Sequence, residues 1–168
     1  GYRRYAILNS MDVEFRHRNA DIVVNGDTQP DIARGEAAAV RIFALTRPPA
    51  PYAGGDPNDQ DNFRRFLGEA PVAEDGSFAA LVPPRTMLIW DVVDDAGNVL
   101  VTERFWAELA PGEVMTCAGC HTPTNGATER TSNIALRNPV NLTGFDADSD
   151  DDGVIDLLAD YQSRQASP

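Results

Sequence analysis

The sequence predicts a mainly β protein: an antiparallel β-sandwich of the immunoglobulin or transthyretin-like kind, followed by an irregular segment and a C-terminal acidic loop with a short helix. Two observations predict the sandwich. The chain before residue 114 is a series of short apolar or alternating runs, and polar turns separate these runs at frequent intervals. A length of 168 residues suits one compact domain with an appendage. No apolar run approaches the roughly 18 residues that a membrane helix requires.

The expected strands follow one another along the chain. They cover residues 3–8, 11–17, 36–46, 66–72, 77–82, 87–93 and 99–106. Ala37 to Ala39 are good helix formers, but the continuation Val-Arg-Ile-Phe-Ala-Leu favours a strand. Residues 47–61 contain four prolines and a Gly-Gly pair, so we expect a long surface loop there. The sequence Asp-Asp-Ala-Gly-Asn at 94–98 predicts a hairpin turn.

The charge balance excludes one class of partner. The net charge is −12, from 26 acidic and 14 basic residues, whereas nucleic-acid binders need a basic surface. Every basic residue is arginine, so electrostatic docking to a redox partner would use acidic patches or arginines. Seven of the acidic residues lie within residues 146–160, a stretch without a basic residue.

The two cysteines of the chain stand in one motif, Cys117-Ala-Gly-Cys120-His121. C-x-x-C-H is the attachment signature of c-type haem. Two thiols at this spacing add to the two vinyl groups of one porphyrin, and the adjacent histidine becomes the proximal iron ligand. The alternatives are a thioredoxin-like redox pair, which does not need the histidine, and half of a zinc site. Zinc would need two further Cys or His ligands, and only His17 remains elsewhere.

The motif also predicts the compartment. Haem c is attached outside the cytoplasm, so we expect a periplasmic or extracellular protein from an organism with a c-type maturation system. The chain begins Gly-Tyr without a basic and apolar leader, so an export signal was either removed or never part of this chain.

The sixth iron ligand is left open by the sequence. All three methionines precede Cys117, which argues against the downstream methionine ligand of mitochondrial-type cytochromes. The nitrogen candidate is His17, which lies on the same face as Val13 and Phe15 if residues 11–17 form an alternating strand. His17 is then a distal haem ligand, a hydrogen-bonded inward histidine or a solvent-exposed one.

A run of aspartates near the C-terminus predicts a calcium loop. Asp148, Asp150, Asp152 and Asp156 occupy positions 1, 3, 5 and 9 of an EF-hand-like pattern, with glycine at position 6. Position 12 is Ala159 rather than the usual glutamate, so the pattern is closer to the short calcium repeats of thrombospondin-type proteins. The alternative is a solvated acidic tail that caps a short helix at residues 154–162.

Several segments together resemble a known family. They are Phe-Leu-Gly-Glu-Ala-Pro-Val-Ala-Glu-Asp-Gly-Ser-Phe at 66–78, Val-Pro at 82–83, Asp-Asp-Ala-Gly at 94–97, and Ala-Pro-Gly-Glu at 110–113 leading into the C-x-x-C-H motif. In this order they resemble the haem-bearing middle domain of the hydrazine synthase alpha subunit and its bacterial relatives, over roughly residues 36–125.

The resemblance implies a β-sandwich whose last strand leads into the haem motif, with Cys117 and Cys120 as thioether attachments and His121 as proximal ligand. It does not imply the enzyme's activity. In hydrazine synthase a tyrosine shortly after the motif approaches the iron, whereas residues 122–126 here read Thr-Pro-Thr-Asn-Gly.

These observations predict three regions and one function. The regions are a β-sandwich at 1–113, a haem-c-binding segment at 114–145, and the aspartate-rich loop and tail at 146–168. The predicted function is one-electron transfer by a single covalent haem, with redox proteins or neighbouring subunits as partners, in a homo-oligomer or larger complex. The alternatives are a structural or assembly module that holds haem and calcium, and a haem enzyme subunit with an open distal site. An enzyme is the less favoured reading, because no further acid–base constellation is evident.

Overall fold

The computed structural model describes residues 4–15, 23–24, 27–28, 32–45, 63–103, 106–119 and 133–144. The strands are β1 (Ala6–Ser10), β2 (Val23–Val24), β3 (Asp27–Thr28), β4 (Ala39–Leu45), β5 (Arg64–Pro71), β6 (Phe78–Val82), β7 (Met87–Val93), β8 (Val99–Thr102), β9 (Ala107–Glu108), β10 (Val114–Cys117) and β11 (Val140–Asn141). The 3₁₀ helix η2 (Ile134–Arg137) follows the motif region.

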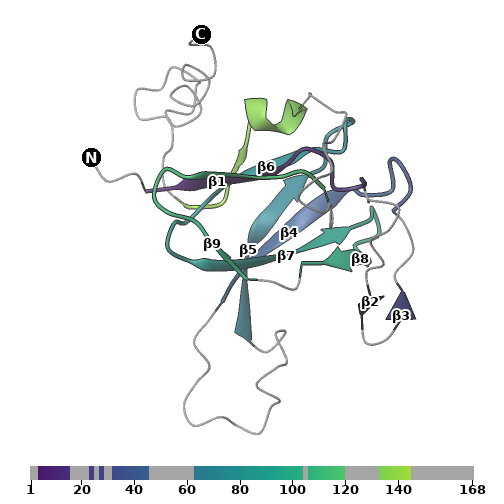
Figure 1. The fold of residues 1–168 in the computed structure, drawn as a ribbon, viewed down its shortest axis with the longest axis horizontal. Helices are drawn as coiled ribbons and strands as arrows, with labels where there is room; N and C mark the ends of the chain where they lie inside the picture. Colours follow the sequence, from purple (N-terminus) through teal and green to yellow (C-terminus); the bar gives the residue numbers. More distant parts are fainter. Residues whose placement is uncertain are drawn as a thin grey trace, which may run out of the picture.

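The strands form two facing sheets, which confirms the predicted mainly β sandwich (Figure 1). One sheet has the order β10-β1-β6-β11, and the other has the order β5-β4-β7-β8 with β9 also paired to β7. The strands β2 and β3 make a separate two-stranded ribbon. Most pairs are antiparallel, but β1 pairs with β10 and β6 pairs with β11 in parallel. These parallel pairs bring the two sides of the motif segment onto one sheet.

The core lies between the two sheets. Alternate residues of each strand point inward, as the two-residue period of a strand requires. Val40 and Ile42 of β4 pack with Leu8 of β1 and Phe78 of β6, and all four side chains are fully buried. Burying a side chain of this size stabilises the fold by about 1.5–3 kcal/mol. This packing fixes the position of β1, the strand beside which the motif strand β10 lies.

The outer face of the four-stranded sheet is covered as well. Ile7 of β1 and Leu81 of β6 point away from the main core and pack against Leu136 of η2. Figure 1 shows this short helix above β1 and β6, on the side opposite the second sheet. Every residue of β1 and β6 is therefore buried, including polar residues of β1.

Several expected elements are confirmed with small shifts in their ends. The strands at 36–46, 66–72, 77–82 and 87–93 correspond to β4, β5, β6 and β7. The hairpin at 94–98 is present: the amide of Asp94 donates to the Asn98 carbonyl, and Gly97 has a φ of 82° that favours glycine. The strand expected at 99–106 ends at Thr102, and the one expected at 3–8 runs from Ala6 to Ser10.

One expected strand is wrong. Within residues 11–15, the described part of the predicted strand 11–17, the chain forms a bend and a turn. The reason is a buried ion cluster, described below, that draws Asp12 and Glu14 inward instead of leaving them on a solvent face. The expected loop at 47–61 and the expected helix at 154–162 lie outside the described residues. In the part of the chain that the structure describes, no helix is long and apolar enough to cross a membrane.

Candidate haem attachment site

The strand β10 places the first cysteine of the motif at its last position. β10 runs parallel to β1 with Cys117 opposite Ser10. The Cys117 carbonyl oxygen accepts a hydrogen bond from the Met11 amide at 2.9 Å and another from the Ser10 hydroxyl at 3.3 Å. The backbone at the first thiol is therefore fixed to a buried strand.

Gly119, between the two cysteines, lies against the turn that follows β1. A Cβ atom on Gly119 would lie 2.8 Å from the Phe15 carbonyl oxygen and 3.1 Å from that of Asp12. Side-chain carbons do not approach backbone atoms this closely, so only glycine fits at this position without a backbone shift. The close contact joins the middle of the motif to residues 12–15.

A cluster of two buried carboxylates and one partly exposed arginine holds this turn. The Arg34 guanidinium donates to both carboxylate oxygens of Asp12, at 3.0 and 2.7 Å, and to Glu14 Oε2 at 2.8 Å. Glu14 Oε1 also accepts from the amides of Gly35 and Ala37. The two carboxylates are buried, whereas the Arg34 side chain is 45% exposed. The adjacent carboxylates raise the pKa of Arg34, chiefly through the hydrogen bond with Asp12. This fork geometry fixes the turn more tightly than a single charge contact would.

The turn at Asp75-Gly76-Ser77, directly before β6, contacts the same region. The Gly76 carbonyl accepts from the Val13 amide at 2.8 Å. A Cβ on Gly76 would lie within 3 Å of Asp12 and Arg34 atoms, and the residue has a φ of 82°. Glycine is thus required here both for backbone conformation and for close packing against the ion cluster.

The Cys117 side chain is half-buried and contacts the main core. Burial raises the pKa of the Cys117 thiol, and the nearby charge of Glu103 raises it further. Both effects disfavour the thiolate, so the free thiol stays protonated and is a weak nucleophile at neutral pH. This environment differs from that of reactive redox cysteines, whose pKa is lowered by positive charge or a helix N-terminus.

The structure describes only part of the predicted site. Cys117 lies at the end of β10, while Cys120, His121 and His17 lie outside the described residues, as do Asp148, Asp150, Asp152 and Asp156. The alternation used to orient His17 does not hold over residues 11–15, because Glu14 is buried beside Val13. Among the described residues there is no group of three or more His, Cys, Asp or Glu side chains placed to bind a metal ion.

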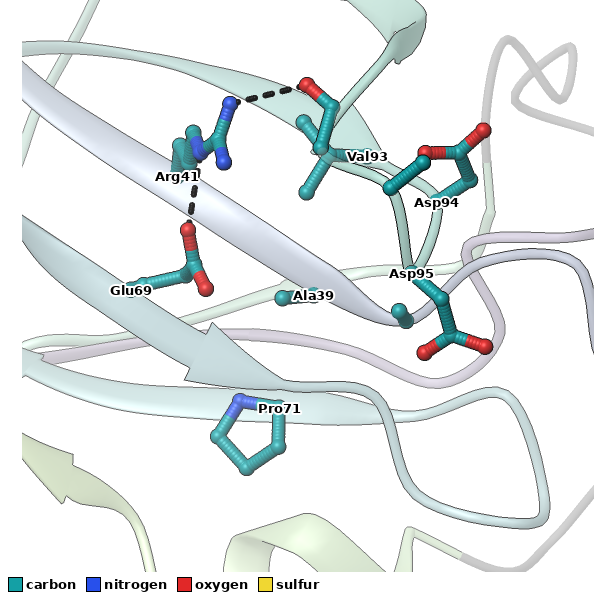
Figure 2. A pocket seen from close by; sticks show the side chains of 10 residues that line it. Ala39, Arg41, Glu69, Pro71, Val93, Asp94 and Asp95 are labelled. Atoms are coloured by element: carbon teal, nitrogen blue, oxygen red, sulfur yellow. Dashed lines mark hydrogen bonds and ion pairs between the residues drawn. The ribbon is translucent and has the colours of Figure 1, made fainter.

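A shallow groove lies on the other sheet, at the β7–β8 hairpin (Figure 2). Arg41 donates to Glu69 Oε2 at 2.8 Å and to the Gly97 carbonyl at 3.0 Å, and Asp94 and Asp95 lie at the hairpin side of the groove. Its lining contains no cysteine or histidine. The groove therefore offers neither a thiol nor an imidazole for haem.

Sequence reasoning did not find the residues that support the motif. The alternation of residues 11–17 places Glu14 on the face opposite Val13, and it says nothing of a partner for Asp12. Arg34 stands in an irregular segment without a pattern. The one usable signal was Asn9, a polar residue inside an otherwise apolar run. Polar residues in such a position need buried partners, but the sequence does not say which.

The fold and the motif together define a class of protein: a β-sandwich domain in which a sheet strand, β10, runs directly into a C-x-x-C-H sequence. The family model described as the hydrazine synthase alpha subunit middle domain matches residues 11–122 of the chain. The chain therefore belongs to the hydrazine synthase alpha subunit middle domain family. This match confirms the resemblance drawn from the sequence.

A solved structure has the same fold. The chain is similar to Kuenenia stuttgartiensis hydrazine synthase with a TM-score of 0.62 and 20% sequence identity, over 82% of this chain and 20% of that chain. At this identity the likeness concerns the fold, and the chain spans only about a fifth of the length of that protein. No curated protein matches the sequence.

Proposed function

We propose that this chain is an extracytoplasmic c-type cytochrome domain that carries one covalent haem and transfers single electrons within a larger complex. The observation that carries the proposal is the C-x-x-C-H motif at the end of β10 in a member of this family. Cys117 and Cys120 would form the thioether bonds, and His121 would be the proximal iron ligand. The haem iron supplies one-electron chemistry by alternating between its ferrous and ferric states.

The described part of the motif fits such an attachment. Cys117 is half-buried at a strand end, with one side against apolar core residues. Its raised pKa keeps the thiol protonated, which disfavours attack on other disulfides before a haem is attached. Gly119 brings the motif backbone against the 12–15 turn without a side chain between them. The protein thus holds the first thiol and the following glycine in a fixed backbone path.

We propose His17 as the distal ligand within this scheme. Gly119 and Phe15 lie in close backbone contact. His121 follows Gly119 by two residues and His17 follows Phe15 by two residues, and two residues of chain span at most about 7 Å. The length of the chain therefore allows both histidines to reach one haem iron. Two imidazole ligands would give a low-spin, six-coordinate iron suited to electron transfer.

Absorption spectra test the proposal. The protein is produced in a host with c-type haem maturation, and its spectra are recorded oxidised, reduced, and reduced with carbon monoxide. We expect about one covalent haem per chain, a low-spin spectrum and no change with carbon monoxide. Loss of covalent haem is expected in the double variant Cys117→Ala/Cys120→Ala, which has no thiol left for a thioether bond. A wild-type chain without covalent haem refutes the cytochrome function, and a carbon monoxide adduct would favour the haem enzyme with an open distal site.

The distal ligand is tested separately. Replacing His17 with alanine is expected to convert the iron to high spin while covalent haem is retained, because His121 and the thioether bonds remain. Replacing His17 with methionine provides a second axial-ligand test through a shift in reduction potential. An unchanged spectrum in His17→Ala would contradict the assignment.

We also propose that Asp148, Asp150, Asp152 and Asp156 bind one calcium ion. Clustered carboxylates without neighbouring basic residues repel one another unless a cation offsets their charge. Chelation is expected to increase proteolysis within residues 146–160, and added calcium is expected to restore protection. Equal cleavage with and without chelator would favour a solvated acidic tail.

The proposed partners are redox proteins or neighbouring subunits. The chain matches about a fifth of the length of a hydrazine synthase chain, and one haem in an 18.2 kDa chain needs an external electron donor and acceptor. The acidic composition favours docking through carboxylate patches or arginines. We place the protein in the periplasm or outside the cell, where haem c is attached. Light scattering across a concentration series tests for a homo-oligomer, and concentration-dependent assembly without electron transfer would favour the structural module.

A further inference from the structure

We propose that Asn9 is a positioning residue for the motif loop, because its side chain joins the strand that enters the loop to the helix that leaves it. By motif loop we mean the stretch of sequence 120–132, which connects the described segments that end at Gly119 and begin at Asn133. The inference rests on the proposed function, since this loop carries Cys120 and His121.

The entry side of the loop is held by the amide nitrogen of Asn9. Asn9 Nδ2 donates to the Met115 carbonyl at 2.9 Å and to Thr116 Oγ1 at 3.1 Å. Both acceptors belong to β10, and Thr116 is the register partner of Asn9 in the parallel pair. These side-chain bonds act on the two residues just before Cys117. They therefore supplement the backbone bonds that fix the first thiol.

The exit side is held by the amide oxygen of the same residue. Asn133 Nδ2 donates to Asn9 Oδ1 at 2.7 Å. Asn133 is also the N-cap of η2, because its own Oδ1 accepts from the Leu136 amide at 3.2 Å. Asn133, the first residue after the motif loop, is thus bonded to Asn9 of β1, a strand that lies more than a hundred residues before the motif.

The helix that follows the loop is anchored independently of Asn9. Asp75 Oδ2 accepts from the Ile134 amide at 3.0 Å, and the Ser77 hydroxyl accepts from the Ala135 amide at 3.1 Å. The Leu136 side chain packs on Ile7 and Leu81. These contacts keep η2 on the sheet, so the contribution of Asn9 is to set the distance between the two loop ends.

The contacts that Asn9 makes with β10 and with Asn133, here called the Asn9 bridge, come from a buried side chain. Asn9 is fully buried, and its amide uses both donor hydrogens and its oxygen in the contacts above. A buried polar group that loses its partner costs more free energy than the bond contributes when formed. The contacts of Asn9 are therefore kept in one arrangement. Because both ends of the connecting sequence are then fixed, we expect haem attachment at Cys120 and His121 to cost less conformational entropy.

The test compares two bridge variants with two controls in the full chain. Asn9→Leu removes all three contacts with a side chain of similar shape. Asn133→Ser removes the bond to Asn9 but keeps a good N-cap residue, so it serves where Asn9→Leu does not fold. Asn138→Ser makes the same substitution at the other end of η2. Val101→Ala lowers stability from β8 on the opposite sheet.

Each variant is measured in two forms. The haem-loaded form gives covalent haem per chain, the high-spin fraction and the reduction potential. The form produced without haem maturation gives amide hydrogen exchange at residues 114–117 and 133–136. A bridge variant is expected to raise exchange at both segments by about tenfold, the factor that corresponds to one lost buried hydrogen bond. It is also expected to lower covalent haem and to increase the high-spin fraction, while both controls keep the wild-type spectrum.

The two hypotheses fail separately. If the wild-type chain takes no haem, the proposed function is refuted, and the exchange measurement alone decides whether Asn9 bridges the loop ends. If the wild type takes haem but Asn133→Ser matches Asn138→Ser in exchange and spectrum, the positioning role is overturned while the cytochrome function stands. A change in stability alone, equal to that of Val101→Ala and with a wild-type spectrum, also overturns it.

Discussion

Replacing Arg34 with alanine is the sharpest test of how the turn under the motif is held. The change removes the cation that pairs with Asp12 and Glu14, whose side chains are 0% and 2% exposed. The two buried carboxylates then lose their Arg34 partner, while backbone amides such as that of Gly35, which donates to Glu14, remain. An uncompensated buried charge is the source of the expected loss of stability.

The magnitude follows from burial. Removing one partner of a fully buried pair costs about 3–5 kcal/mol. The Arg34 side chain is 45% exposed, so solvent screens part of the attraction and also reaches the vacated space. We therefore expect a loss of about 2 kcal/mol in the free energy of unfolding. For a chain of this size that corresponds to a fall in Tm of roughly 4–8 °C.

The assay is urea unfolding followed by tryptophan fluorescence, since Trp90 lies in the core. Arg41→Ala is the matched control. Its ion pair with Glu69 has the same length as the Arg34–Glu14 contact, 2.8 Å, but both of its side chains are at least one third exposed. An exposed pair of this kind contributes at most about 1 kcal/mol. Equal losses in the two variants would refute the reasoning, because burial would then not decide the cost.

Three further results are expected. Gly119→Ala should lower both the covalent haem content and the stability, because the added methyl group meets two backbone carbonyls. Ala118→Gly in the same motif is the control and should leave the haem content near wild type. Equal haem content in the two variants would contradict the close contact. In the haem-free chain, the pKa of the Cys117 thiol is raised in the native state, so the unfolded state loses this proton at a lower pH. Stability should therefore fall as the pH rises above about 8.5. This pH dependence should vanish on thioether formation or in Cys117→Ser. Hydrogen bonds from the Asn98 side chain and backbone lower the pKa of Asp94. The carboxylate should therefore contribute to stability above about pH 4, and this contribution should be lost as the pH falls further. In melting curves recorded over a pH series, Asp94→Ala should reduce the loss of stability at low pH, and an unchanged pH dependence would show that the hairpin bonds do not matter.

The strands were predictable where the local pattern and the tertiary packing agree. In β4 and β7 the alternation and the flanking turns indicate the strands found, and Gly97 marks the hairpin between β7 and β8. The prediction failed at residues 11–15, where alternating acids resemble a solvent face. Arg34, some twenty residues away, compensates those acids inside the protein, and no local rule connects the two segments.

The parallel pairs were also beyond local reasoning. β1 meets β10 across more than a hundred residues, and β11 meets β6 across about sixty. A hairpin leaves turn residues in the sequence, but a long-range parallel pair leaves no such mark. The contacts of Asn9 belong to the same category, because they connect three segments that become neighbours only after the sandwich has formed.

What the sequence by itself determined is the C-x-x-C-H motif and the class of fold. Thiol and imidazole at fixed spacing are covalent facts of the chain, and short alternating runs with turns indicate a sandwich in whatever order the strands pair. What only the tertiary structure decided is the support of the motif: β10 beside β1, Gly119 against the 12–15 turn, and buried charges and amides that hold both. The physical reason is that burial and hydrogen-bond pairing depend on which distant segments meet, and that meeting is settled by the packing of the whole core.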